Sequence, residues 1–357
     1  MFKSALRPVI TALALVLPLA AIAGGYSDVA AVPAKASPLA AKSLLNGLAR
    51  AGERIVAVGQ RGHIVLSDDG GKSWRQAAVP VSSDLVAVCF PSAKQGWAVG
   101  HDGVVLHSAN AGATWTLQLD GHRAGQLMQA HYARLAESGA LSSAEQTDRL
   151  LDDVKRIAGQ GAENPFLDVW FGDERNGFIV GAFNLIFRTA DGGKSWEPWF
   201  DRTDNPNRLH LYALRGIGSD VYAVGEQGLV LKFDAQASRF RALETPYKGT
   251  YFGVTGNDDK VLVFGLRGNA YRSADGGRSW AKVDSGVQDG LTGAAAFGPR
   301  GLLVVSQSGQ VLVSKDAGEH LSPLKLMQPA PASAVLAVGG DTVVIAGARG
   351  VRAEALR

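Results

Sequence analysis

Short apolar runs that close with Val-Gly or a similar pair recur along most of the chain. Each run is followed by a glycine-containing turn and a second short run in which apolar and polar residues alternate, a pattern typical of half-buried β-strands. The runs close at Gly59, Gly100, Gly181, Gly225, Gly265, Ser306 and Gly347. These positions lie about 41 residues apart, except for one interval of 81 residues between Gly100 and Gly181. The spacing therefore predicts seven copies of one unit.

Each unit is consistent with four short strands separated by glycine-rich turns. In the second unit we expect strands over residues 85–90, 96–100, 104–107 and 114–119. Four strands at this period are typical of a β-propeller blade, whereas a leucine-rich solenoid repeats every ~20–29 residues and a helical repeat has a period of ~3.6. We therefore predict an all-β fold, a seven-bladed β-propeller over residues 24–357.

An eight-residue box with the pattern S/T-x-D-x-G-x-x-W follows several of the apolar runs. It is complete at Ser67–Trp74, Thr189–Trp196 and Ser273–Trp280 and looser at Ser108–Trp115 and Ser314–Leu321. The aspartate of a hairpin turn accepts hydrogen bonds from nearby backbone N–H groups, the second glycine takes a positive φ, and the tryptophan buries a large ring. Copies on several blades cannot form one active site. We therefore predict a structural role for Asp69, Gly71, Trp74, Asn110, Trp115, Asp191, Gly193, Trp196, Asp275, Gly277, Trp280 and Asp316.

The boxes resemble the Asp-box, or BNR, repeats of sialidase-like propellers. The longer pattern GW-A-V-G-x-x-G-x-V-L-x-S-x-D-G-G-x-S-W is more specifically similar to the photosystem II stability/assembly factor family. Gly96–Trp115 and Gly177–Trp196 carry it best, whereas Phe233–Phe240 of the fourth unit has lost the box. The resemblance implies a seven-bladed, non-enzymatic propeller that docks on membrane-protein partners during assembly.

The last unit is short, with three strand patterns over residues 334–338, 343–346 and 351–356. Unused sequence precedes the first unit. We expect Asp28–Val32 to supply the missing outer strand of the seventh blade and so to protect its open edge.

Residues 121–164, between the second and third blades, break the repeat. Leu127, His131 and Leu135 follow helical spacing, and Ser142-x-x-Glu145 is a capping box that opens a second helix. Leu150, Leu151, Val154 and Ile157 form one apolar stripe on that helix. This predicts a helical hairpin, which either packs on the propeller or serves as a lid or docking arm.

The first residues have the features of an export signal. Lys3 and Arg7 precede an apolar run over residues 9–23, which ends in Ala21-Ile22-Ala23. The run is shorter than the ~20 residues of a membrane-spanning helix, and its end fits signal-peptide cleavage. We therefore predict a signal peptide over residues 1–23, no membrane span in the mature chain, and a periplasmic or secreted protein.

Composition and charge exclude several classes of protein. Of 357 residues, 46% are apolar and 19% charged, which excludes a disordered chain. Cys89 is the single cysteine, so no disulfide forms within the chain. The net charge of +3 falls to +1 without Lys3 and Arg7, and we therefore expect no nucleic-acid partner.

Candidate partner-binding residues lie in the turns that follow the apolar runs, on the face that also receives the insertion. Arginine is a forked donor suited to anionic groups, and the turns of blades one, five and seven each contain one. The alternative is that these are solvated turn residues. The candidates are Arg61, His101, Arg267 and Arg349.

Catalytic constellations cannot be assembled from the sequence. The F/Y-R-I-P motif of sialidase-like enzymes is missing, and no tyrosine–glutamate pair can be nominated. No histidine cluster has metal-ligand spacing, no phosphate-binding loop precedes a helix, and we predict no cofactor. The sequence favours an exported scaffold or assembly factor that is a monomer outside its complex and docks on a membrane-associated or envelope protein complex, such as a transporter. The alternative is a sialidase-like or other glycan-active propeller hydrolase.

Overall fold

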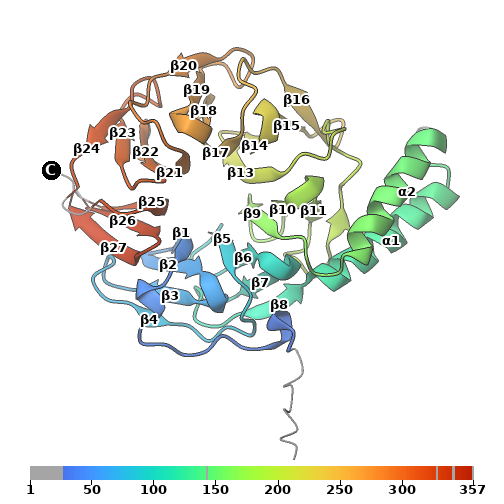
Figure 1. Ribbon diagram of the computed structural model, residues 1–357, viewed down its shortest axis with the longest axis horizontal. Coiled ribbons are helices and arrows are strands. Elements are labelled where there is room, and N and C mark those ends of the chain that lie inside the picture. Colours follow the sequence, from blue (N-terminus) through green and yellow to red (C-terminus); the bar gives the residue numbers. More distant parts are fainter. Residues whose placement is uncertain (1–26, 142–143, 327–328, 340–341, 356–357) are drawn as a thin grey trace, which may run out of the picture.

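The computed structural model describes residues 27–141, 144–326, 329–339 and 342–355. Seven antiparallel sheets stand around a central axis as the blades of a propeller (Figure 1). Six sheets have four strands, and the seventh has three. The predicted all-β, seven-bladed fold with a helical insertion is confirmed.

The strands follow one another from the axis outward in every blade. Blades one and two comprise β1 (Leu45–Ala51), β2 (Arg54–Gly59), β3 (Ile64–Ser67), β4 (Arg75–Gln76), β5 (Leu85–Cys89), β6 (Gly96–Gly100), β7 (Val105–Ser108) and β8 (Thr116–Leu119). Blades three and four comprise β9 (Phe166–Phe171), β10 (Gly177–Gly181), β11 (Ile186–Thr189), β12 (Glu197–Pro198), β13 (Leu211–Ile217), β14 (Asp220–Gly225), β15 (Val230–Asp234) and β16 (Arg239–Leu243). Blades five to seven comprise β17 (Tyr251–Asn257), β18 (Lys260–Gly265), β19 (Ala270–Ser273), β20 (Ala281–Val283), β21 (Leu291–Phe297), β22 (Gly301–Ser306), β23 (Val311–Ser314), β24 (Ser322–Leu324), β25 (Ala332–Gly339), β26 (Thr342–Gly347) and β27 (Gly350–Ala355).

The hydrophobic core lies between the blades. The second strand of each blade is buried on both faces, because each face packs against a neighbouring sheet. A strand buried on both sides needs a continuous apolar run and not an alternating one. This explains why the second strands are the most visible part of the repeat in the sequence.

The predicted strand at Asp28–Val32 is wrong. The Asp28 carboxylate accepts a hydrogen bond from Ala30 N at 2.9 Å and caps a short 3₁₀ helix, η1 (Val29–Ala31). The carbonyl of Val29 accepts from Ser82 N at 2.8 Å, and Ala34 N donates to the carbonyl of Val79 at 3.1 Å. The segment thus lies along the link that leaves blade one. A capping aspartate favours a turn over an extended strand, which is the physical reason for the error.

The ring closes by side-chain packing between blades seven and one. Leu45 and Ala57 of blade one share a buried cluster with Ala346 of blade seven. The guanidinium of Arg50 also donates to the carbonyl of Ala337, with an Nη2–O distance of 3.0 Å. Among the described residues, β27 therefore remains without a fourth strand at its outer edge.

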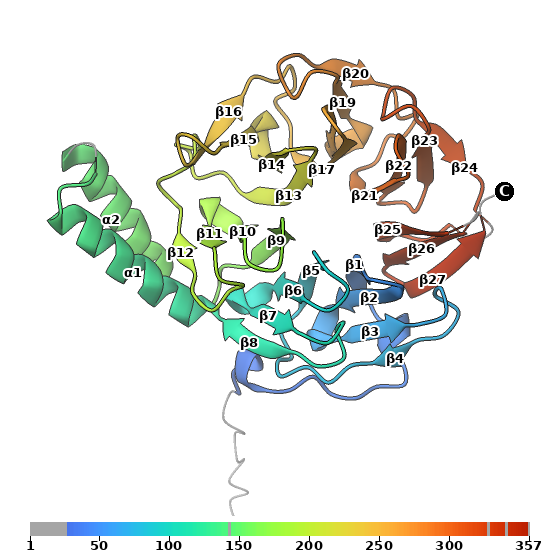
Figure 2. The ribbon, with the colours of Figure 1, turned by 180° about the vertical axis from the view of Figure 1, so that it is seen from behind.

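The insertion forms a hairpin of two helices, α1 (Gly121–Glu137) and α2 (Ala144–Gly159). Gly125 lets the helices approach closely, since a Cβ there would lie 3.0 Å from Cα of Ala158. The Tyr132 hydroxyl donates to the Asp201 carboxylate at 2.8 Å and ties α1 to blade three. In two views from opposite sides the helices lie outside the ring, so the hairpin is not a lid over the central opening (Figures 1 and 2).

Some predictions concern residues that the structure does not describe. The predicted signal peptide, residues 1–23, lies outside the described residues, as does Ser142 of the predicted capping box. Within the described ranges, no helix is long and apolar enough to cross a membrane.

Candidate functional site

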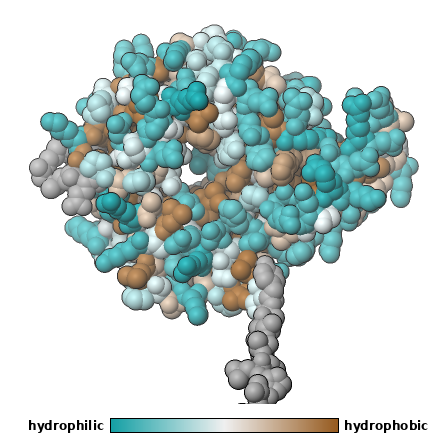
Figure 3. Space-filling view, viewed as in Figure 1, coloured by the Kyte–Doolittle hydropathy of each residue, from teal (hydrophilic) through white to brown (hydrophobic). Residues whose placement is uncertain are grey.

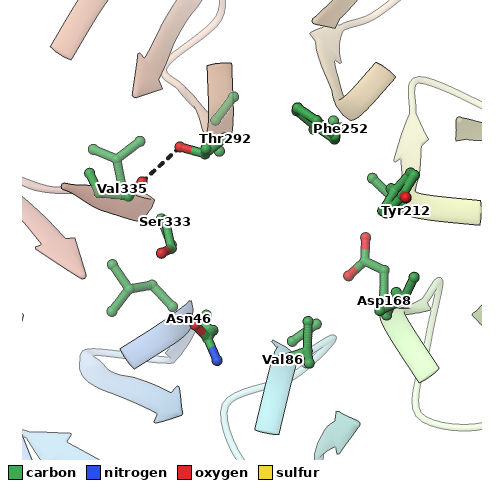
Figure 4. A pocket seen from close by; sticks show the side chains of 18 of the residues that line it. Asn46, Val86, Asp168, Tyr212, Phe252, Thr292, Ser333 and Val335 are labelled. Atoms are coloured by element: carbon green, nitrogen blue, oxygen red, sulfur yellow. Dashed lines mark hydrogen bonds between the residues drawn. The ribbon is translucent and has the colours of Figure 1, made fainter. Parts of the chain in front are cut away.

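The inner strand of every blade contains a bulge at its second residue. In β1 the pairing with β2 shifts between Leu45 and Gly47, so Asn46 stands out of the ladder, and the other six inner strands show the same irregularity. A bulge bends the strand and re-aims the unpaired residue. The seven bulge residues line a central cavity of about 530 Å³ (Figure 4); they are Asn46, Val86, Leu167, Tyr212, Phe252, Thr292 and Ser333.

The ring of bulge residues, here called the channel mouth, lies at one end of the cavity. Leu45 pairs with Gly59, and the turn to β3 follows Gly59 directly. The channel mouth is therefore on the face that carries these turns and the link leading to the helical hairpin. We call this the hairpin face and the opposite one, which carries the Asp-box turns, the box face. Figure 3 shows one face of the molecule, with the central opening and hydrophobic residues gathered beside it.

The channel mouth is amphipathic around its circumference. Blades two to five contribute the apolar and aromatic bulge residues Val86, Leu167, Tyr212 and Phe252, whereas blades six, seven and one contribute Thr292, Ser333 and Asn46. The polar residues already join neighbouring blades. Asn46 Nδ2 donates to the carbonyl of Leu85 at 2.8 Å, and the Thr292 hydroxyl donates to the carbonyl of Ala332 at 2.7 Å.

Asp168 breaks the pattern of the inner strands. It follows the bulge residue of blade three, where the other blades carry the small residues Gly47, Ala87, Ala213, Gly253, Gly293 and Ala334. Only 3% of Asp168 is exposed, and its carboxylate accepts from Leu214 N at 2.8 Å and from Nη1 of Arg215. Burial raises the pKa of Asp168, while the Arg215 guanidinium opposes this shift. The pair joins the inner strands of blades three and four.

Arg215 also presents part of its guanidinium to the cavity. Its side chain is 43% exposed, and both of its hydrogen bonds use Nη1. In the described part of the chain, Nε and Nη2 have no hydrogen-bond partner. The cavity therefore offers one cationic donor below the apolar arc of the mouth.

A series of aromatic rings runs from the helical hairpin to the channel mouth. Arg156 of α2 lies 5.8 Å from the ring of Phe183, which meets the ring of His210 edge to face at 4.6 Å. His210 is followed by Tyr212, with ring centroids 6.1 Å apart, and Tyr212 by Phe252 at 5.6 Å. This aromatic path crosses blades three, four and five. Burial, followed by the charge of Glu226, raises the pKa of Tyr212, so its hydroxyl stays neutral near pH 7.

The four sequence-predicted partner-binding residues are all exposed on the hairpin face. Arg61 and Arg267 occupy left-handed positions, with φ of 57° for both, and His101 begins the corresponding turn of blade two. Arg349 lies in the tight turn between β26 and β27. No hydrogen bond or ion pair of the described structure joins any two of them, and none lines the central cavity. Arg349, Arg61 and His101 lie on three consecutive blades, whereas Arg267 stands apart on blade five.

The Asp-box residues form self-contained turns on the box face. Asp69 Oδ1 accepts from the N–H groups of Lys72 and Ser73 and from the Ser67 hydroxyl, and its Oδ2 accepts from the Ser73 hydroxyl. The Ser73 bonds and then the Ser67 bond hold the pKa of Asp69 well below its usual range. The turns at Asn110, Asp191, Asp275 and Asp316 repeat this geometry.

The central cavity does not assemble the residues of a sialidase-like site. Of the described residues that line it, Tyr212 is the single tyrosine, Asp168 the single carboxylate and Arg215 the single arginine. A tyrosine–glutamate pair and a three-arginine clamp are therefore not found at this opening. The described residues also hold no cluster of three side chains suited to a metal ion.

The channel mouth and the aromatic path were not found from the sequence. A signal for Asp168 was present, because an alignment of the seven inner strands shows one carboxylate among glycines and alanines. The bulges had no comparable signal, since the register between two strands is a property of their pairing. The aromatic path joins residues that are distant in the sequence.

Comparison with known proteins shows which family this chain belongs to. A family model described as photosynthesis system II assembly factor YCF48 matches residues 43–136 and 156–296, and the unmatched interval falls within the helical hairpin. The photosystem II assembly lipoprotein Ycf48 of Synechococcus sp. (strain CC9902) is 31% identical over 131 residues, which is 35% of this chain and 38% of that protein. The chloroplastic photosystem II stability/assembly factor HCF136 of Oryza sativa subsp. japonica is 23% identical over 181 residues, 50% of this chain and 40% of that protein. The matches thus span about two fifths of these relatives.

Solved structures show the same fold. A structure of YCF48 bound to a D1 peptide has a TM-score of 0.63 and 14% identity, covering 89% of this chain and 94% of that one. YCF48 from Cyanidioschyzon merolae has a TM-score of 0.60 and 17% identity, covering 91% and 99%. The WD40 propeller of Doa1 has a TM-score of 0.61 at 8% identity, covering 92% and 96%.

The family model covers more than half of the chain, and the resemblance drawn from the repeats is confirmed. Both curated relatives are named as assembly factors and not as enzymes, in agreement with the expectation of a non-enzymatic protein. The chain belongs to the photosystem II assembly factor YCF48 family.

Proposed function

We propose that this protein is an exported, non-catalytic assembly factor that docks on a membrane-associated protein complex of the cell envelope through its hairpin face. The family supports the general role, because both curated relatives are photosystem II assembly factors. A solved YCF48 structure contains a D1 peptide, which supports a peptide segment as the kind of ligand. The residues of the hairpin face indicate what kind of client this chain binds.

The observation that carries the proposal is the amphipathic channel mouth. The aromatic rings of Tyr212 and Phe252 are half-buried at an open cavity, and the ring series continues from them to Phe183. Aromatic side chains with one open face are frequent anchors of protein interfaces. A cavity of about 530 Å³ suits one or two apolar side chains of a peptide, whose backbone can meet the polar arc.

Charge on the same face supports a client segment that carries acidic groups. Arg349 and Arg61 stand on blades seven and one, beside the polar arc, and His101 and Arg267 stand on blades two and five, beside the apolar arc. Rim charges of this kind chiefly speed association and orient the partner. We propose that these four residues steer the segment toward the mouth, while the aromatic side chains hold it.

The helical hairpin is proposed as a docking arm. It is anchored to the propeller by Tyr132 of α1 and by an ion pair between Arg208 Nε and Asp153 Oδ2 of α2 at 3.1 Å. Its outer half projects beyond the ring, as both views show (Figures 1 and 2). The anchored helical hairpin thus enlarges the hairpin face beyond the ring, next to the aromatic path.

A transporter of the envelope is the client class that we propose to test first. The predicted signal would send the chain to the side of the membrane on which loops and termini of such a complex are accessible. The Asp-boxes, by contrast, are proposed to stabilise the fold and not to bind a client, because their carboxylates accept hydrogen bonds from groups of their own turns.

The experiment is crosslinking and recovery of the protein from envelope extracts, with client proteins identified by mass spectrometry. The test variant is Tyr212→Ser with Phe252→Ser at the channel mouth. The matched control is Lys72→Ser with Lys194→Ser, two exposed residues of the box face. We expect the control to recover the same clients as the wild type and the mouth variant to lose them. Undiminished recovery by the folded mouth variant would overturn the proposal.

A further inference from the structure

The outer edge of blade seven differs from the edges of the other six blades. In each of the other six blades, the third strand pairs with the second strand on one side and with the fourth strand on the other. In blade seven the third strand is β27, which pairs with β26 alone among the described residues. β27 is six residues long, whereas the outermost strands of the other blades have two to five. Its residues Val351–Glu354 are half-buried, while the third strands elsewhere are mostly buried. Long unpaired edges are templates for pairing with another strand.

The described part of the N-terminal segment, which starts at residue 27, does not cover this edge. Its short helix η2 (Ala40–Lys42) reaches only the start of β27, where the carbonyl of Ala41 lies 2.1 Å from the position of a Cβ on Gly350. The described segment begins near α1, with Asp28 Oδ2 4.0 Å from Nε2 of His122. Blade one lies between that point and β27 (Figure 1).

The side chains on β27 leave two buried groups without a partner. Arg352 Nε donates to Glu354 Oε1 at 2.6 Å, but Arg352 Nη2 and Glu354 Oε2 are buried and have no hydrogen-bond partner. Both residues lie on one face of the strand, since they stand two positions apart. One nitrogen of Arg352 and one oxygen of Glu354 are therefore enclosed by the chain itself without a partner.

The sequence of the edge is complementary to itself. Two copies of β27 can pair antiparallel with Ala353 opposite Ala353. Arg352 of the first copy then stands opposite Glu354 of the second, and Glu354 of the first stands opposite Arg352 of the second. Directly opposite side chains share a face, with Cβ atoms ~4.5–5.5 Å apart. The Arg352 and Glu354 side chains are 24% and 10% exposed, and opposite charges on facing strands favour this register. A two-fold interface requires this kind of self-complementary surface.

We infer that a second copy of this chain pairs with the outer edge of β27, so that each blade seven supplies the fourth strand of the other. The hairpin face is free of this contact, because α1 and α2 project from the opposite side of the ring (Figure 1). β27 starts at the hairpin face and ends at the box face. Antiparallel pairing therefore points the two channel mouths in opposite directions, and one membrane surface can engage only one of them. The inference differs from the expected monomer and does not rest on the proposed docking function.

The test is the oligomeric state of the mature protein, measured by sedimentation and light scattering from ~1 to ~200 μM. We expect a dimer for the wild type, and monomers for Arg352→Glu and for Glu354→Arg, because like charges then stand opposite each other. An equimolar mixture of these two variants is expected to recover the dimer, since each edge then complements the other. The double variant that exchanges both residues should also pair with itself. Arg349→Glu, in the adjacent turn, serves as the matched charge-reversal control and should remain dimeric.

Hydrogen exchange supplies a readout that does not depend on the variants folding. In the wild type, backbone amides of residues 351–355 should gain protection as the protein concentration rises. A wild type that stays monomeric at ~200 μM, a mixture of the two single variants that stays monomeric, or amides protected equally at every concentration would each overturn the inference. Pairing of the edge with a heterologous strand, without self-association, would overturn it as well.

Discussion

The two faces of the propeller are built from the same repeat and use their polar groups in opposite ways. On the box face, the Asp69 carboxylate accepts hydrogen bonds from its own turn, as the other box carboxylates do from theirs, and the box tryptophans Trp115 and Trp196 are buried. On the hairpin face, bulges turn side chains away from the ladder, left-handed turns hold Arg61 and Arg267 in the open, and aromatic rings remain half-exposed. A repeat can thus stabilise the fold at one end of the blades and leave the other end for binding.

The difference makes a simple prediction about substitutions. Changes on the box face should reduce stability and leave docking intact. Changes on the hairpin face should weaken docking and leave stability nearly unchanged. The Asp168–Arg215 pair lies between these extremes, because it lines the cavity and also joins two blades. Four experiments separate these effects.

The largest loss of stability is expected for Trp115→Ala. The ring is 5% exposed and packs in the cluster shared by blades one and two, and its Nε1 donates to the carbonyl of Gly112 at 2.9 Å. Removing a buried aromatic side chain costs about 3–5 kcal/mol. Urea unfolding followed by circular dichroism measures the loss. Client recovery at a temperature where the variant is folded should equal that of the wild type; its disappearance would break the separation between the faces.

A smaller, pH-dependent loss is expected for Arg215→Met. The substitution leaves the buried Asp168 carboxylate without its cation, at a cost of about 2–3 kcal/mol near pH 7, reduced from the fully buried case because Arg215 is 43% exposed. Burial then raises the pKa of Asp168 further. A group with a raised folded pKa favours folding below its unfolded pKa and loses that contribution as the pH rises through the folded pKa. The deficit should therefore shrink between pH 7 and pH 4.5 in urea unfolding. An equal deficit at both pH values would contradict this account of the pair.

Asp275→Asn should reduce stability by less than either of these changes. The Ser279 hydroxyl and backbone N–H, and then the Ser273 hydroxyl, hold the pKa of Asp275 well below its usual range. A group with a lowered folded pKa stabilises the fold above its unfolded pKa, near ~4, and loses that contribution as the pH falls through the folded pKa. The difference between wild type and variant should therefore be constant from pH 8 to pH 5 and shrink only in stronger acid. A difference that shrinks already between pH 7 and pH 6 would show that another group is titrating.

The smallest loss of stability, under about 1 kcal/mol, is expected for Tyr212→Ser. Its ring is half-buried at the channel mouth, and its hydroxyl bonds to no described residue. Client recovery, in contrast, should fall strongly. Thermal unfolding and crosslinking on the same preparation measure both quantities. Recovery unchanged in the folded variant would remove the mouth from the docking surface.

Much of the fold could be predicted because the repeat is expressed in local patterns. The second strands, buried on both sides, produce the apolar runs, and the boxes repeat the same turn residues. The loss of the box in blade four was also visible, and there Phe233 packs against Phe178 with ring centroids 5.4 Å apart. The helical hairpin was predicted from its capping and its apolar stripe.

The errors and omissions have physical causes. The sequence does not indicate whether Asp28 caps a turn or lies in a strand, and in the structure its side chain caps a turn. The channel mouth depends on a shift in pairing of one residue, and the Arg156–Phe183–His210 contacts depend on three elements meeting in space. Arg61, His101, Arg267 and Arg349 were placed correctly on one face by topology, but their role in binding stays a prediction.

Site-specific photocrosslinking in intact cells tests the central claim most directly. A photoreactive amino acid is placed singly at Arg61, Leu266 and Arg349 on the hairpin face, and singly at Lys72, Lys194 and Arg278 on the box face; all six residues are exposed. The account predicts that the three hairpin-face positions crosslink to one common envelope protein complex and that the three box-face positions do not. Crosslinks to that complex from the box face, or equal crosslinking from both faces, would contradict it.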